Sequence, residues 1–161
     1  MGSEDGRLTH LDDRGAARMV DVSAKSVSRR TARARGRIAL EPATLDLLRE
    51  GKVPKGDVLA VARVAGIMAA KRTSEIVPLC HNIFLEKVEV SFSVEEDGVA
   101  IEALAVCSEK TGVEMEALTA VSTAALAIWD MCKAVDSSMR IEGIHVVEKR
   151  KEAIGEEGEA R

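Results

Sequence analysis

The stretch from residue 87 to residue 106 constrains the fold most. Residues 87–94 alternate strictly between polar and apolar side chains, which is typical of a strand with one buried face. Residues 95–98, Glu-Glu-Asp-Gly, supply turn chemistry, and the apolar-rich residues 99–106 follow. Two strands joined by so short a turn predict an antiparallel hairpin near the middle of the chain.

The segments on either side of this hairpin predict two more strands and several helices. Residues 33–40 alternate charged and small or apolar side chains, and residues 139–147 predict a final strand. Residues 44–48 predict a short helix, and Asp57 can cap a longer one with apolar residues at helical spacing. Residues 114–135 predict a long apolar helix. The order β-α-β-β-α-β predicts an α+β, ferredoxin-like fold, an antiparallel sheet with helices packed on one face.

We expect one folded unit between two looser ends. The chain has 161 residues, which suits a single domain. Residues 1–16 are expected to be loose, residues 17–148 to form the ferredoxin-like domain, and residues 149–161 to be a disordered, charged tail.

The composition limits the core, the compartment and the partners. Aromatic residues make up 2% of the chain, so the core must use small aliphatic side chains, which bury little area each and favour self-association. A net charge of −4 argues against a general nucleic-acid binder. Three distant cysteines without a Cys-x-x-Cys motif favour free thiols in a reducing compartment, without a metal site. The chain has no apolar run of about 18 residues, so we expect no membrane span.

A first group of candidate functional residues is basic. Lys55 precedes the helix that Asp57 can cap, where free backbone N–H groups favour anions. Arg63 and Lys71 lie further along the same helix. Ordinary helix capping and helix solubility also explain these charges, and for this group taken alone we favour that explanation over anion binding.

A second candidate is the loop sequence Leu79-Cys80-His81. An imidazole there can act as an acid, a base or a phosphate ligand near neutral pH. A lone loop histidine is more often structural, and no set of partners at metal-ligand spacing accompanies this one.

The long helix carries candidates at both ends. Glu114, Met115 and Glu116 open it, although acidic residues in a first turn are also good partners for the helix dipole. Asp130 and Lys133 lie three residues apart and therefore share a helix face. They interrupt an otherwise apolar stretch, where a charged pair needs a partner or a purpose.

The arginines at positions 29, 30, 33, 35 and 37 leave two interpretations open. They could bind nucleic acid, but the chain offers few aromatic side chains for stacking on bases. Alternation places Arg33, Arg35 and Arg37 on one solvent-exposed face of a strand, which we prefer.

Taken together, these stretches resemble the molybdenum-cofactor biosynthesis protein C family, the cyclic pyranopterin monophosphate synthases. The matching segments are residues 8–10, 19–25, 55–58, 65–67, 69–73, 78–81, 87–90, 110–119 and 130–135. Several long segments in the same order make a chance similarity untenable. One departure is Asn82, which follows His81 where the family usually has Pro, a residue that would hold His81 in extended conformations.

The resemblance implies a reaction and its requirements. The expected enzyme is a lyase that converts 3′,8-cyclo-7,8-dihydroguanosine 5′-triphosphate, made by a radical enzyme, to cyclic pyranopterin monophosphate with release of pyrophosphate. No cofactor is expected beyond magnesium that accompanies the triphosphate. The family also implies a cytoplasmic homohexamer, a trimer of dimers with sites at subunit interfaces, with neither nucleic acid nor membrane as a partner.

The resemblance also assigns roles to residues. It places catalysis on Asp130, Lys133 and Lys55, and substrate binding on Leu79, Cys80, His81, Met115, Glu116, Glu114 and Lys71. We add Arg63 as a further phosphate ligand. Two other classes of function stay open at this stage: a ligand-binding module without turnover, and a structural oligomer that associates with nucleic acid through its arginine strand.

Overall fold

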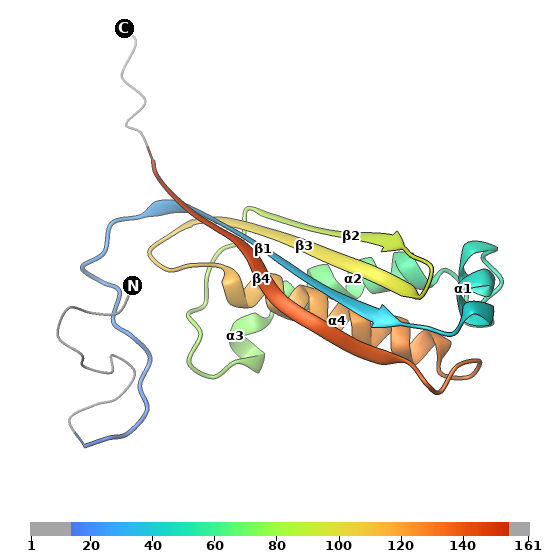
Figure 1. The fold of residues 1–161 in the computed structure, drawn as a ribbon. Helices are drawn as coiled ribbons and strands as arrows, with labels where there is room; N and C mark the ends of the chain where they lie inside the picture. Colours follow the sequence, from blue (N-terminus) through green and yellow to red (C-terminus); the bar gives the residue numbers. More distant parts are fainter. Residues whose placement is uncertain (1–13, 155–161) are drawn as a thin grey trace, which may run out of the picture.

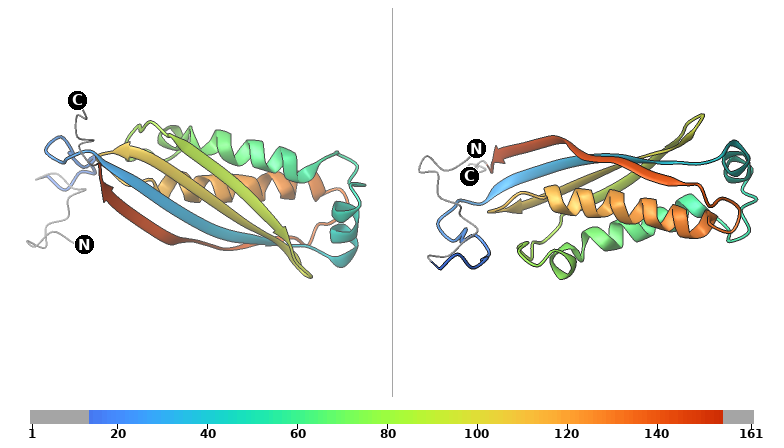
Figure 2. Two further views of the ribbon diagram at one scale, coloured as in Figure 1. Left: turned by 90° about the horizontal axis from the view of Figure 1, so that it is seen from above. Right: turned by 60° about the horizontal axis from the view of Figure 1, so that its bottom comes forward.

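A four-stranded antiparallel sheet covered on one face by two helices forms the protein (Figures 1 and 2). The computed structural model describes residues 14–154. The elements follow in the order β1 (Ser28–Ala39), α1 (Pro42–Arg49), α2 (Val58–Ala70), α3 (Thr73–Ile76), β2 (Lys87–Val94), β3 (Gly98–Glu109), α4 (Glu114–Cys132) and β4 (Arg140–Ala153). The sheet order is β2-β3-β1-β4. The predicted ferredoxin-like α+β fold is therefore confirmed.

Some predicted boundaries were wrong. Strand β4 continues to Ala153 because its charged end pairs with the start of β1, where Ser28 lies opposite Ala153. Residues 149–153 are therefore strand, and the prediction of a disordered tail fails for them. The predicted tail beyond residue 154 and the start of the predicted loose segment, residues 1–13, lie outside the described residues.

The core consists of small aliphatic side chains, as the composition predicts. Strand β3 sends Val99, Ile101 and Ala103 toward the helices. Four alanines of α4 are fully buried in the same core: Ala117, Ala120, Ala124 and Ala125. Helices α2 and α4 approach each other closely at Gly66, where an added Cβ would lie 2.9 Å from the backbone carbonyl oxygen of Ala120. This close packing holds α4 against both α2 and the sheet.

The opposite face of the sheet is open and charged. Arg35 and Arg37 of β1 point away from the helices, and each is paired with a carboxylate: Arg35 Nε lies 2.6 Å from Glu102, and Arg37 lies 2.6 Å from Asp97. Alternation on β1 thus places these arginines as predicted. Among the described residues, no helix is long and apolar enough to span a membrane.

Candidate active site

Helix α4 carries a cluster of functional side chains at each end. At its N-terminal end is a pocket of about 540 Å³. The pocket is lined by Val20, Val22, Lys25, Leu79, Cys80, His81, Ile83, Thr111, Gly112, Glu114, Met115, Glu116 and Lys149. The fold therefore brings two predicted groups together, the loop residues 79–81 and the helix residues 114–116.

Glu116 is the buried carboxyl group of this pocket. Its side chain belongs to the first turn of α4 and only 3% of the residue is exposed. Burial, opposed by a hydrogen bond from its own backbone amide and assisted by the nearby negative charge of Glu114, raises the pKa of Glu116 to about 6. A carboxyl group with this pKa can hold or release a proton close to neutral pH.

The mouth of the pocket is charged. Glu114 forms an ion pair with Lys149 of β4, and Lys25 lines the same wall. Gly112 lies so close to the Glu114 carboxylate that any larger residue there would displace it. Cationic side chains at the rim of a pocket are suited to hold phosphate oxygens.

The segment before β1 forms one side of the pocket. The Nε2–H of His81 donates a hydrogen bond of 2.8 Å to the carbonyl oxygen of Val20, which the carbonyl requires because it can only accept. The ammonium group of Lys110 donates across 2.8 Å to the carbonyl oxygen of Ser23. His81 thus fastens the N-terminal segment over the pocket as well as lining it.

The second cluster lies at the C-terminal end of α4. The Oδ1 of Asp130 lies 2.6 Å from Nζ of Lys133, and its Oδ2 lies 2.9 Å from Nζ of Lys55. Hydrogen bonds from Lys133 and Lys55, together with their positive charges, lower the pKa of Asp130 to about 2. The predicted catalytic residues therefore meet in one chain as an ionised carboxylate between two ammonium groups.

The two clusters do not meet within one chain. Glu116 and Asp130 belong to the same helix, α4, fourteen positions apart. At about 1.5 Å of rise per residue they are separated by roughly 21 Å along the axis. A group that transfers a proton must lie within about 3 Å of its target or one water molecule away.

Two predicted ligands lie outside both clusters. Arg63 is an exposed residue of α2, whose Nε donates across 3.1 Å to the carbonyl oxygen of Val90 and whose guanidinium lies 5.6 Å from the centre of the Phe92 ring. Lys71 is exposed at the C-cap of α2, the end of that helix near the start of α4 (Figure 2). Neither residue lines the pocket at the start of α4.

The described residues hold no group of three or more His, Cys, Asp or Glu side chains that could bind a metal ion. The cysteines at 80, 107 and 132 are free thiols. Burial, followed by the charge of Glu116, raises the pKa of Cys80, and burial raises that of Cys107 to about 12, so both stay protonated at neutral pH.

Comparison with known proteins fits this arrangement. The profile of the MoaC family matches residues 19–152, which include both clusters. The chain belongs to the MoaC family. A cyclic pyranopterin monophosphate synthase of Chloroflexus aggregans is 60% identical over 146 residues, covering 89% of this chain and 88% of that protein. Proteins with the same name from Thermomicrobium roseum, 60% identical over 144 residues, and Pelotomaculum thermopropionicum, 57% identical over 144 residues, cover 88% of this chain and 87% and 85% of their own lengths.

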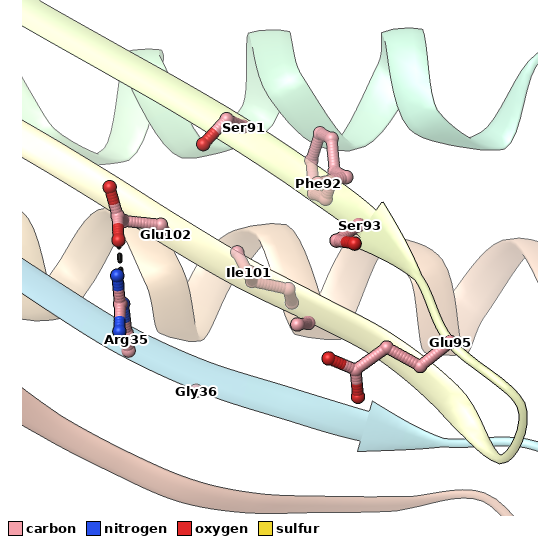
Figure 3. A pocket seen from close by; sticks show the side chains of 9 residues that line it. Arg35, Gly36, Ser91, Phe92, Ser93, Glu95, Ile101 and Glu102 are labelled. Atoms are coloured by element: carbon pink, nitrogen blue, oxygen red, sulfur yellow. Dashed lines mark hydrogen bonds and ion pairs between the residues drawn. The ribbon is translucent and has the colours of Figure 1, made fainter.

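Sequence reasoning missed several pocket residues of this MoaC-family chain. Val20, Val22 and Lys25 lie in a segment that resembles the family, and that resemblance was the available signal. Lys149 was assigned to the tail, because nothing local distinguishes it from the charged residues that follow. A further cavity, of about 390 Å³, lies on the open face of the sheet (Figure 3) and contains none of the predicted site residues.

Proposed function

We propose that this MoaC-family protein is a cyclic pyranopterin monophosphate synthase. Its substrate would be 3′,8-cyclo-7,8-dihydroguanosine 5′-triphosphate, and its products cyclic pyranopterin monophosphate and pyrophosphate, which makes it a lyase. The observation that carries the proposal is the presence of two different carboxyl groups on α4. Glu116 is buried in a pocket lined by lysines and has a pKa near neutrality, and Asp130 is ionised between two lysines.

The chemistry requires groups of both kinds. Opening the five-membered ring of the purine and rebuilding it needs several proton transfers, and hence acids and bases with different pKa values. We assign the proton-transfer core to Asp130, Lys133 and Lys55. Expulsion of pyrophosphate builds negative charge on the leaving oxygens, which positively charged side chains stabilise.

The remaining candidates bind the substrate in this proposal. Glu114 and Glu116 orient the purine end, while Leu79 and Met115 give the pocket apolar walls and Cys80 is a protonated thiol beside them. His81, Lys71 and Arg63 serve the phosphates or the base. We propose no cofactor beyond magnesium carried by the triphosphate.

We further propose that each active site is shared by two subunits. Because about 21 Å separates Glu116 from Asp130 along α4, one chain cannot present both to one reacting centre. A two-fold axis that sets two copies of α4 antiparallel would bring Glu116 of one copy to Asp130 of the other. Exposed apolar side chains on the helical layer, Val61, Val64, Met68 and Leu126, are consistent with such an interface. The assembly would be a cytoplasmic homohexamer, a trimer of dimers, supplied by the radical enzyme that makes the substrate.

Incubation of the purified protein with the cyclic guanosine triphosphate tests the function. Stoichiometric pyrophosphate and pterin are expected without any added protein. If the substrate binds tightly yet stays unchanged across a range of pH, the protein is a binding module and the enzyme proposal is wrong. Salt-dependent binding to duplex DNA or RNA would instead favour the arginine-strand alternative.

A further inference from the structure

Within the arginine row of β1, Arg33 forms ion pairs with both neighbouring strands. Arg33 lies between two neighbouring strands: its guanidinium pairs with Glu102 of β3 on one side, and its Nε lies 3.2 Å from Oε2 of Glu148 of β4 on the other. The side chains of Arg33, Glu102 and Glu148 are only 33%, 23% and 27% exposed. Glu102 also accepts from Arg35 on the open face of the sheet (Figure 3). The network is therefore partly shielded from solvent, where ion pairs are stronger than on an open surface.

The pairing between β1 and β4 changes register beside this network. Ala34 lies opposite Val146, but its neighbour Arg33 lies opposite Glu148, so Val147 is an extra residue in β4. An extra residue of this kind is a β-bulge, and it turns every side chain that follows to the other face of the sheet. Lys149 consequently lies opposite Ala32, whose side chain is buried beneath the helices.

This change of face decides whether Lys149 reaches the pocket. On the helical side of the sheet it forms its ion pair with Glu114 and lines the pocket. If pairing continued from Ala34 without the extra residue, Ala32 would lie opposite Glu148. Glu148 would then face the helices, and Lys149 would face solvent on the other side.

Among the described residues, this end of β4 is held by its pairing with β1 and by side-chain ion pairs. The strand lies at the edge of the sheet, so β1 is its one strand neighbour among the described residues. Such a strand can slip in register where its two faces do not differ strongly in polarity, and the segment after Val147 is charged on both faces. Glu148 is paired with Arg33 across the strands and with Arg150 of its own strand.

We propose that Arg33 is a positioning residue: by pairing with Glu148 just after the bulge, it sets the register of the end of β4 and so delivers Lys149 to the pocket. The planar guanidinium can bind carboxylates on two sides at once, which suits it to hold β4 and β3 to β1 together. The change in KM that tests this proposal rests on the proposed function. The change in hydrogen exchange at the end of β4 can be measured whether or not the protein turns over a substrate.

The first test compares Arg33→Gln with Arg37→Gln. Arg37 is a matched control, since it lies on the same strand and face and also pairs with β4, its guanidinium 3.0 Å from Glu142, at the end away from Lys149. We expect Arg33→Gln to raise KM about 10-fold with a smaller change in kcat, as loss of a binding contact does, and Arg37→Gln to leave KM unchanged. Arg33→Lys keeps the positive charge but lacks the forked donors of the guanidinium, so it should give an intermediate KM. It replaces Arg33→Gln in the test if that variant folds poorly.

The second test is a double-mutant cycle. Glu148→Gln should raise KM in the unmodified chain but add nothing in a Lys149→Ala background, because the pair acts through Lys149. Hydrogen exchange supplies the independent readout: the amides of residues 146–150 should exchange faster in Arg33→Gln and at the normal rate in Arg37→Gln.

Equal effects of the two arginine variants on exchange, or an undiminished effect of Glu148→Gln in the Lys149→Ala background, would overturn the positioning role. Failure of the proposed function looks different, since the unmodified protein would then release no pyrophosphate. The exchange comparison would still decide whether Arg33 sets the register.

Discussion

The ammonium group of Lys55 lies 2.9 Å from Oδ2 of Asp130, a residue 75 positions away in the sequence. The same group donates across 2.8 Å to the backbone carbonyl oxygen of Asp130. The loop before α2 is thus attached to the last turn of α4, and with Lys133 it surrounds one carboxylate by two positive charges.

Substitutions of Lys133, in this cluster, and of Arg63, outside it, should have different kinetic effects. Lys133→Ala should lower kcat by about 100-fold or more, because it removes a group that transfers a proton or stabilises transition-state charge. Arg63→Ala should mainly raise KM, through lost contacts with the phosphates. Steady-state kinetics measures both. Lys52→Ala is the control, since Lys52 lies in the same loop as Lys55 but pairs with Glu50. Near-normal kcat for Lys133→Ala would exclude its proposed role.

Burial of Glu116 predicts a pH-dependent stability. Its folded-state pKa of about 6 lies above the value of about 4.3 in an unfolded chain. The folded form therefore binds the proton more tightly, so stability is greatest below about pH 4 and falls as pH rises to about 6. Glu116→Gln removes this dependence. At pH 8 the variant should be more stable than the unmodified protein by about 1–2 kcal/mol.

Urea unfolding at pH 8 and pH 4 measures this difference. The advantage of Glu116→Gln should shrink at pH 4, where the native carboxyl group is also neutral, and the variant should be inactive at both values. If the variant and the unmodified protein differ in stability by the same amount at the two pH values, burial does not raise the pKa of Glu116 and the prediction is wrong.

Asp136 predicts a stability effect at the other end of the molecule. The residue is 5% exposed. Its Oδ2 accepts from the backbone N–H of Glu41 at 2.9 Å, and its Oδ1 accepts from the backbone N–H and the hydroxyl of Ser138 at 2.9 and 2.8 Å. Asp136→Ala removes the acceptor of the backbone N–H groups of Glu41 and Ser138, while the Ser138 hydroxyl keeps its hydrogen bond to Glu41 Oε1, and should cost about 2–4 kcal/mol. Ser138→Ala, which removes one donor and keeps the carboxylate, should cost about 1 kcal/mol.

The pH dependence of this loss has a definite sign. Burial raises the pKa of Asp136, but hydrogen bonds from Glu41, Ser138 and Thr44 outweigh it and hold the pKa below its ordinary value. The contribution of the carboxylate is therefore present above the unfolded pKa of about 3.9 and is lost as pH falls below it. Chemical unfolding of Asp136→Ala at pH 7 and pH 3 should show a large deficit at the first and a smaller one at the second.

Local patterns predicted the elements well where one face is buried. Strand β2 has the predicted bounds, because each of its side chains faces either the helices or solvent. Strand β4 was cut short, since the charged residues after Glu148 are held by pairing with the distant start of β1, and no local pattern reveals that partner. The short helix α3 was also missed.

The site was predictable as a set of residues but not as a geometry. The sequence already put Glu116 and Asp130 at opposite ends of one predicted helix, but only the fold shows that Lys55 meets Asp130. Arg63 stays a predicted phosphate ligand, and its contacts within one chain, with the Phe92 ring and the carbonyl oxygen of Val90, come from the packing of α2 on β2. Long-range packing, which leaves no local signal, decided each of these cases.

The separation of Glu116 from Asp130 predicts that two inactive variants can restore each other. Fourteen steps of about 100° return to nearly the same face of α4, so both side chains can point toward a second copy of the helix. In a dimer of Glu116→Ala with Asp130→Asn, one shared site carries both lesions and the other carries neither. Activity should then reappear at up to about half of the unmodified value per mixed interface.

Co-expression with two different affinity tags isolates the mixed oligomers, and pyrophosphate release measures their activity. Glu116→Ala mixed with Glu116→Ala, and Asp130→Asn with Asp130→Asn, should stay inactive and control for the tags. A pair from one end of α4, Asp130→Asn with Lys133→Ala, should also stay inactive, because both residues come from the same subunit at each site and every site then carries one lesion. Verified mixed oligomers of Glu116→Ala and Asp130→Asn that remain as inactive as their parents would show that each site lies within one chain.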